Sequence, residues 1–224
     1  MTANINHDYI DSFLLGMIPD SSGILKEMEE YSEEHNVPII TPDIAGLLAV
    51  IIKSANIKSI LEVGTAIGYS AIHMGLCAEK GFSITTIERD ESSAAKAKEF
   101  IKKAGMENNI KIVTGNAEEI LKDVQGRFDM IFIDAAKGQY MDFLKDSIDK
   151  LRTGGLFVCD NVLFRGMVAE RSLLVRRKIT IVKRLKKFLN FISNCESLKT
   201  SIVPMGDGIS ISCKLKEVEF IEKV

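Results

Sequence analysis

The stretch SILEVGTAIGYS, residues 59–70, decides the fold class of this 224-residue chain. An apolar run typical of a strand buried on both faces leads into a glycine turn and then into a helical pattern. Gly64 and Gly68 allow a tight turn, after which the N-terminus of a helix faces a ligand. The stretch therefore predicts the first strand, turn and helix of an α/β fold that binds its ligand beyond the carboxyl ends of the strands.

Similar apolar runs continue outward from this stretch. They are SITTIE (83–88), IKIVTG (110–115), FDMIFID (128–134) and GLFVCD (155–160), and helical patterns separate them. Helical crossovers are what parallel strand pairing requires. Two final runs are joined by the turn-forming MGDG (205–208), which favours an antiparallel hairpin. We predict an α/β fold with a doubly wound, mostly parallel Rossmann-like sheet, an antiparallel C-terminal hairpin and N-terminal helices.

The chain shows no linker-like tract, so we expect one domain over residues 1–224, with a helical cap at 1–56 and the Rossmann-like core at 57–224. Hydrophobic residues make up 46% of the sequence, enough for a continuous core. No apolar run approaches the roughly 18 residues of a membrane span, and the N-terminus has no signal-peptide pattern. We therefore predict a cytoplasmic protein without membrane association.

Residues at the ends of the first three predicted strands suit a nucleoside cofactor. A dinucleotide fingerprint needs a second glycine where Ala66 stands, and this residue obstructs the approach of a pyrophosphate. Glu88 lies 24 residues after Gly64, where an acid can accept both ribose hydroxyls, although a solvated acid is the alternative. Asn116 is a good helix N-cap in its own right, and its segment could also contact an adenine.

Oxygen-bearing side chains end the fourth and fifth predicted strands. Asp134 ends the fourth, and Asp160 and Asn161 end the fifth. Neighbouring parallel strands would bring these side chains together, and their oxygens are the ligands that Mg²⁺ or another hard divalent cation prefers. The four cysteines are far apart without a C-x-x-C pair, so a zinc site is not indicated. Lys137 is a candidate base or electrostatic helper, and an exposed lysine at a helix start is the alternative.

Positive charge is concentrated in one segment, although the formal net charge is only −2. Residues 165–187 contain nine basic residues and one acid. Such a block is a candidate contact for a polyanion, because binding depends on where the charges lie. Apolar residues at positions 174, 181, 185, 188 and 192 fit one helical face, so an ordinary amphipathic surface helix is the alternative.

Four motifs, LEVGTAIGYSA, TIERDE, FIDAAKGQY and DNVLFRGMV, resemble those of the cation-dependent O-methyltransferases that use S-adenosylmethionine, the group of the catechol and caffeoyl-CoA enzymes. The likeness extends from EEHNVPI to VPMGDGISIS, and IDAAKGQY with DNVLFRG carries it most specifically. It implies a class I methyltransferase fold, S-adenosylmethionine and Mg²⁺ as cofactors, and a homodimer.

The resemblance also implies roles for residues at matching positions. Asp134, Asp160 and Asn161 would hold Mg²⁺, and Lys137 and Asp134 would take part in catalysis. The residues implied in cofactor binding are Ile40, Glu62, Gly64, Ser70, Glu88, Asn116, Ala117 and Asp134.

Two kinds of acceptor are compatible with this resemblance. Within the family, the sequence is most similar to bacterial enzymes that methylate 5-hydroxyuridine in tRNA. We favour the wobble uridine of a tRNA anticodon loop, because its flanking phosphates need a positive surface, which Arg165, Arg176, Arg177 and Lys178 would supply. The alternative is a small acceptor of the catechol or caffeoyl-CoA kind. A nucleotide-binding protein or an NAD-dependent oxidoreductase is a remoter alternative.

Overall fold

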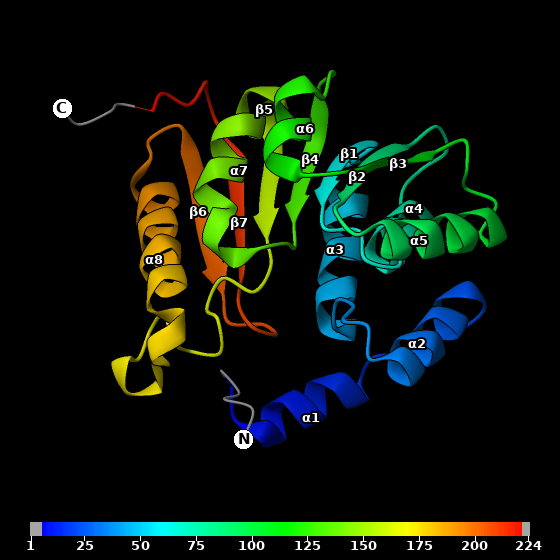
Figure 1. Ribbon diagram of the computed structural model, residues 1–224, viewed down its shortest axis with the longest axis horizontal. Coiled ribbons are helices and arrows are strands. Elements are labelled where there is room, and N and C mark those ends of the chain that lie inside the picture. The colour runs from blue at the N-terminus through cyan, green and yellow to red at the C-terminus, as the bar shows by residue number, and fades with distance from the viewer. Residues whose placement is uncertain (1–5, 221–224) are drawn as a thin grey trace. The chain divides into compact units, whose positions relative to one another are not determined.

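The computed structural model describes residues 6–220. Two compact units divide the chain, one formed by His7–Ile120 and the other from Leu121 onward (Figure 1). They are called here the N-terminal unit and the C-terminal unit. Asn6 belongs to the C-terminal unit, where its side-chain amide donates a hydrogen bond of 2.9 Å to the carbonyl oxygen of Pro204.

The N-terminal unit contains three parallel strands in the order β3-β2-β1. Their bounds are Ser59–Val63 for β1, Ser83–Glu88 for β2 and Ile110–Thr114 for β3. Val63 pairs with Ile87, and Glu88 pairs with Thr114, so the carboxyl ends of the three strands lie at one edge. This register places the glycine turn, Glu88 and the residues after β3 at the same edge of the sheet.

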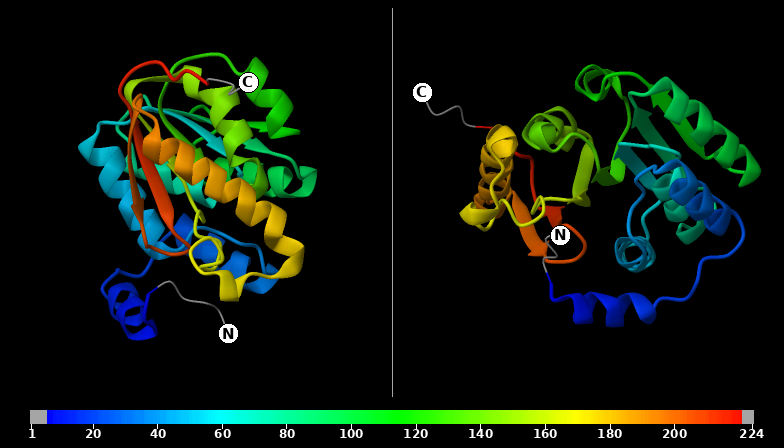
Figure 2. Two further views of the ribbon diagram at one scale, coloured as in Figure 1. Left: turned by 90° about the vertical axis from the view of Figure 1, so that its left-hand side faces the viewer. Right: turned by 60° about the horizontal axis from the view of Figure 1, so that its bottom comes forward.

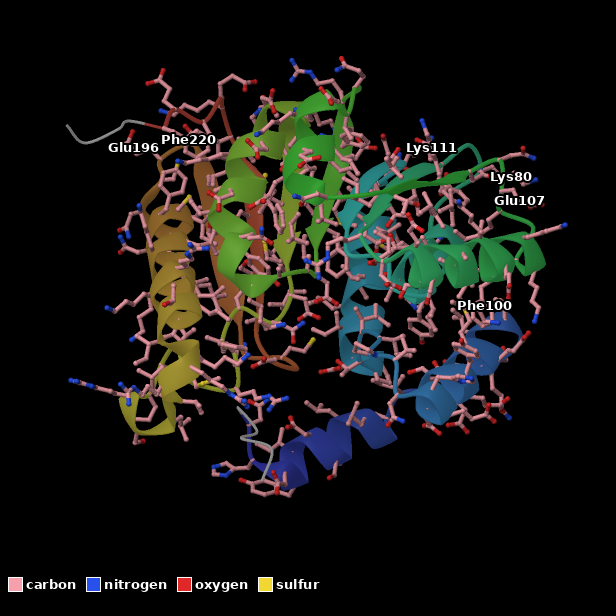
Figure 3. All side chains as sticks on the ribbon, in the orientation of Figure 1. Lys80, Phe100, Glu107, Lys111, Glu196 and Phe220 are labelled. Carbon is pink, nitrogen blue, oxygen red and sulfur yellow. The ribbon has the colours of Figure 1, made fainter. Side chains whose placement is uncertain are left out.

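Helices in this unit are α1 (Asp8–Gly16), α2 (Ile24–His35), α3 (Pro42–Ser54), α4 (Tyr69–Cys77) and α5 (Glu91–Lys103). Both α4 and α5 pack on β2 and β3, and α3 packs on α4. Phe100 points from α5 toward α2, where its ring meets that of Tyr31 edge-on at a centroid distance of 5.6 Å (Figure 3). Pro42 opens α3 at a position where its missing N–H costs nothing.

The C-terminal unit contains a mixed set of strands in the order β4-β5-β7-β6. Their bounds are Phe128–Ile133 for β4, Leu151–Cys159 for β5, Leu198–Val203 for β6 and Ile209–Lys214 for β7. β4 and β5 are parallel, whereas β7 runs antiparallel to both β5 and β6. The hairpin predicted from MGDG is therefore confirmed.

Helices of this unit are α7 (Tyr140–Ser147) and α8 (Ile179–Asn194), with α6 (Ala117–Asp123) crossing the boundary between the units. Short 3₁₀ turns occur at η1 (Lys137–Gln139), η2 (Ile148–Lys150), η3 (Arg171–Leu173) and η4 (Arg176–Lys178). The left view of Figure 2 shows α8 lying along β6. The hydroxyl of Thr200 in β6 donates a 2.7 Å hydrogen bond to the carbonyl of Ile192 in α8.

The amphipathic helix predicted from position 174 onward begins later than its apolar pattern indicates. Leu185, Phe188 and Ile192 are buried on one face of α8, as the pattern predicts. Leu174 lies outside the helix, because it and Val175 have extended backbone dihedrals that interrupt the helical hydrogen bonds. Between residues 6 and 220, no helix is long and apolar enough to cross a membrane.

Candidate active site

The glycine turn after β1 has an unusual backbone that Glu88 stabilises. Gly64 and Gly68 have φ values of 100° and 88°, and Ala66 between them has a φ of 45°. A left-handed alanine costs about 1 to 2 kcal/mol, so it needs compensating contacts. The Ala66 amide supplies one, because it donates a 2.8 Å hydrogen bond to Oε2 of Glu88.

Glu88 also accepts a second backbone hydrogen bond. Its Oε1 accepts from the amide of Asp90 at 2.8 Å, at the start of α5. A carboxylate offers about four acceptor positions, so two bonds leave room for the hydroxyls of a ligand. The side chain is partly exposed, as such a ligand would require. Glu88 thus links the glycine turn to β2 and can still accept hydrogen bonds from a ribose.

Glu62 is fully buried beneath the same turn. Its carboxylate accepts hydrogen bonds from the hydroxyls of Ser70 and Thr86. The hydroxyls of Thr65 and Thr86 are also hydrogen bonded to each other. Because buried carboxylates are costly unless hydrogen bonded, we infer that Glu62 fixes the turn by holding the first residues of α4 to the sheet.

Asn116 follows β3 and is exposed. Its Oδ1 accepts a 3.2 Å hydrogen bond from the amide of Glu118, so the helix-cap interpretation is confirmed. Ala117 opens α6 beside it, and the preceding Gly115 amide donates to the carbonyl of Glu88 at 2.8 Å. The structure therefore joins the ends of β2 and β3. Ile40 is buried just before α3.

The acids predicted at the ends of β4 and β5 do come together. The amide of Asp160 donates a 3.0 Å hydrogen bond to the carbonyl of Ile133, the residue before Asp134. The side-chain amide of Asn161 donates a 2.9 Å hydrogen bond to Oδ1 of Asp134. Asn161 has a φ of 59°, and its backbone amide bonds to Oδ1 of Asp160 at 2.6 Å. Two carboxylates and one amide group thus converge on one point of the C-terminal unit.

Burial perturbs both carboxylates, and the charge of Asp134 also acts on Asp160. Burial raises the pKa of Asp134, against the opposing effects of Lys137 and of the Asn161 hydrogen bond. The pKa of Asp160 is raised to about 7 by burial and then by the charge of Asp134. A divalent cation would relieve this repulsion, and the oxygen donors suit a hard one. The donor set therefore fits Mg²⁺. Across residues 6–220, His, Cys, Asp and Glu alone form no metal-binding group of three.

The raised pKa of Asp160 predicts a pH-dependent stability of the metal-free protein. Asp160 is protonated in the folded state and ionised in the unfolded state between the ordinary pKa of 3.8 and about 7. Its contribution to stability is therefore complete below the lower value and is lost as pH rises through the upper one, a loss of roughly 4 kcal/mol. With a chelator present, we expect the melting temperature to fall as the pH rises from about 4 to about 7.

The variant Asp160→Asn provides the matched control, because its amide has nearly the same shape and does not titrate. Its chelated form should lose much less stability over the same pH interval in a scanning calorimetry experiment. If the melting temperature falls equally with pH in the variant and in the original chain, Asp160 is not the group responsible.

Two residues of this region were not singled out by sequence reasoning. Tyr140 is buried, and its hydroxyl donates a 2.8 Å hydrogen bond to the carbonyl of Asp160. Burial, followed by the charge of Asp134, raises its pKa well above the ordinary value. Asp207 lies in the turn between β6 and β7, and its carboxylate accepts a hydrogen bond from the backbone amide of Arg165. Tyr140 ends the quoted motif FIDAAKGQY, whereas MGDG was considered only as a turn.

The positive segment is mostly exposed. Arg165, Arg176 and Arg177 are exposed, and Lys178 lies 5.7 Å from the ring centroid of Phe164. Arg184 of α8 donates a 3.3 Å hydrogen bond to the carbonyl of Gly138, next to Lys137. No ion pair within residues 6–220 involves a basic residue of the segment 165–187. The segment therefore presents a large excess of positive charge, and Arg184 connects it to the loop of Lys137.

The strand arrangement and the residues at the strand ends define a class I methyltransferase. A solved structure from Staphylococcus aureus, provisionally classed as a caffeoyl-CoA O-methyltransferase, matches with a TM-score of 0.85 and 32% identity. The match covers 92% of this chain and 100% of the other. The predicted doubly wound, mostly parallel fold with its antiparallel hairpin is thereby confirmed.

The chain belongs to the O-methyltransferase family, whose model matches residues 18–215. Caffeoyl-CoA O-methyltransferase of Stellaria longipes is 28% identical over 93% of this chain and 91% of its own length. Catechol O-methyltransferase of Niastella koreensis is 36% identical over 59% of this chain and 62% of its own length. The predicted cation-dependent family and S-adenosylmethionine-dependent O-methyl transfer are confirmed. The oxidoreductase and binding-protein alternatives are thereby set aside.

Proposed function

We propose that this enzyme methylates one of two neighbouring oxygens on a small catechol-like acceptor, with S-adenosylmethionine as methyl donor and a divalent cation at Asp134, Asp160 and Asn161. The convergence of these three side chains carries the proposal. Relatives named for caffeoyl-CoA and catechol support this acceptor class, so they favour the alternative over the tRNA acceptor predicted above.

In this proposal, residues of the N-terminal unit bind the methyl donor. Glu88 accepts the ribose hydroxyls with the acceptor positions that its two backbone bonds leave free. Gly64 and Ser70 lie at the methionine end, where Glu62 keeps Ser70 in place. Asn116 and Ala117 contact the adenine, and Ile40 supplies apolar surface. Ala66 is tolerated because this cofactor has no pyrophosphate.

Residues of the C-terminal unit bind and orient the acceptor oxygen. Asp134, Asp160 and Asn161 would hold Mg²⁺. When bound, the ion supplies positive charge that favours the deprotonated acceptor hydroxyl and fixes its direction. Lys137 accepts the proton from that hydroxyl. Methyl transfer is an in-line displacement, so holding the acceptor oxygen in one direction contributes much of the rate.

The tRNA acceptor is retained as a second candidate because of the exposed cations at Arg165, Arg176 and Arg177 and the half-buried Lys178 beside them. An unstacked anticodon base and its flanking phosphates would suit a site bordered by positive charge. In 5-hydroxyuridine, the 5-oxygen and the 4-carbonyl form the same neighbouring pair as a catechol. The homodimer and the cytoplasmic location stay predictions.

Methylation assays with small acceptors and with tRNA test the proposed function. We expect the purified enzyme to methylate catechol or caffeate in the presence of S-adenosylmethionine and Mg²⁺, and to lose this activity with excess chelator. Liquid chromatography with mass spectrometry measures the product. Activity undiminished by chelation, or no methylation of any neighbouring oxygen pair, would refute the proposal.

Unmethylated tRNA bearing 5-hydroxyuridine serves as the second acceptor in the same assay. If tRNA is a substrate, replacing Arg176, Arg177 and Lys178 together by glutamine should weaken tRNA turnover by about tenfold or more, because each lost phosphate contact lowers affinity and its salt dependence. Methylation of catechol by the triple variant is the internal control. Absence of tRNA turnover would leave the small acceptor as the better candidate. Turnover of tRNA that the substitutions do not change would show that the basic segment is only a solvated helix face.

A further inference from the structure

The loop that follows β5 adopts a conformation that its own residues disfavour. Asn161, Phe164 and Arg165 all have positive φ values, of 59°, 48° and 55°. Asparagine tolerates such a conformation, but for Phe164 and Arg165 it persists only when surrounding contacts enforce it. Asn161 begins this loop and is a proposed ligand of the cation. The contacts that enforce the loop therefore bear on the geometry of the site.

Those contacts come from the turn between β6 and β7, beside which the loop passes (Figure 1). The amide of Val162 donates to the carbonyl of Gly208, and the amide of Leu163 donates to the carbonyl of Asp207, both at 2.9 Å. The amide of Arg165 donates to the Asp207 carboxylate. The loop directly after Asn161 is thus held by three hydrogen bonds, two to backbone carbonyls and one to the Asp207 carboxylate.

The turn between β6 and β7 lies in close contact with the loop. Gly208 has a φ of 83°, and a Cβ at this position would collide with the side chain of Leu163. Val162 and Phe164 of the loop are buried, which restricts its movement further. Burial raises the pKa of Asp207 against the opposing charge of Lys137, and the charge of Asp207 makes a small contribution to the raised pKa of Asp160, so Asp207 is within electrostatic reach of the site.

We propose that Asp207 is a positioning residue for the cation site: its carboxylate holds Arg165 in the left-handed conformation and thereby fixes the loop that presents Asn161. This inference rests on the proposed function, because it takes Asn161 as a ligand of the ion. Asp207 acts through the loop and is not itself assigned as a ligand. Supporting groups of this kind typically change metal affinity by about 10 to 100-fold.

Manganese binding to the full-length, cofactor-free chain tests the inference without any turnover. Titration followed by electron paramagnetic resonance should show an Mn²⁺ dissociation constant about 10 to 100-fold higher for Asp207→Ala than for the original chain. Asp207→Asn should stay within about threefold, because its amide oxygen can accept the same hydrogen bond from Arg165. Similar losses of Mn²⁺ affinity in the two variants would overturn the inference. The cause would then be the lost negative charge of Asp207 and not the position of the loop.

A second substitution separates positioning from a general loss of structure. Arg165→Gly in the Asp207→Ala background should recover most of the Mn²⁺ affinity, because glycine adopts a positive φ without penalty. Failure of this double variant to recover affinity would contradict the proposed role. The double variant also provides the decisive measurement if Asp207→Ala alone does not fold.

Glu196→Ala is the matched acid-to-alanine control. Glu196 precedes β6, at the opposite end of that strand from the turn, and its side chain is 90% exposed (Figure 3). It should bind Mn²⁺ like the original chain. Absence of Mn²⁺ binding by the original chain would refute the proposed cation site itself. Normal binding by the original chain with unchanged binding by Asp207→Ala would refute only the role of Asp207.

Discussion

Replacing Asp160 by alanine is expected to lower kcat/KM for methyl transfer by about 10³-fold or more, which corresponds to about 4 kcal/mol of transition-state stabilisation. Asp160 lies at the convergence of the three proposed ligands, and its backbone amide and carboxylate bond to Ile133 and Asn161. Its removal takes one charged oxygen ligand from the cation. The same substitution leaves the N-terminal unit unchanged, so affinity for S-adenosylmethionine should be retained.

Two measurements on the same protein decide this prediction. Calorimetric titration gives the affinity for S-adenosylmethionine, and initial rates with catechol give kcat and KM separately. Lost methylation with retained cofactor binding would also exclude a protein that only binds the nucleoside. Methylation by Asp160→Ala at rates near those of the original chain would refute the assignment of Asp160 as a ligand. Glu196→Ala again serves as the control in the same unit.

The second large effect is expected at the cofactor. Replacing Glu88 by alanine should weaken S-adenosylmethionine binding by about 10 to 100-fold, because hydrogen bonds to a charged acceptor contribute about 1.5 to 3 kcal/mol each. Part of this loss comes from the ribose hydroxyls. Another part comes from the Ala66 amide, which loses the acceptor that supports its left-handed backbone.

Comparison of two variants separates these parts. Glu88→Gln keeps one side-chain oxygen that can accept from Ala66, so its affinity should lie between those of the alanine variant and the original chain. Glu107→Ala is the control, because Glu107 is an exposed acid in the same unit and lies between α5 and β3 (Figure 3). If calorimetry gives Glu88→Ala and Glu107→Ala the same affinity for S-adenosylmethionine, Glu88 is not part of the cofactor site.

Most of the strands and helices, and the strand ends that carry the site residues, could be predicted from the sequence. Continuous apolar runs separated by helical patterns identified the parallel strands, and MGDG identified the hairpin, because burial and turn formation depend on residues close together in sequence. The positions of Glu88, Asp134 and Asp160 followed from the strand ends alone. The family motifs indicated methyl transfer, which the spacing of apolar residues cannot predict.

The contacts that hold these residues in place are visible only in the folded chain. Glu62 is buried under its turn, and Asp207 holds Arg165 across 42 positions of the sequence. The left-handed backbones of Ala66 and Arg165 could not be predicted either, since neither residue favours that conformation. Such features depend on hydrogen bonds between segments far apart in the chain. Local sequence sets which elements form, but the partners of a loop are fixed only when the strands that it connects have paired.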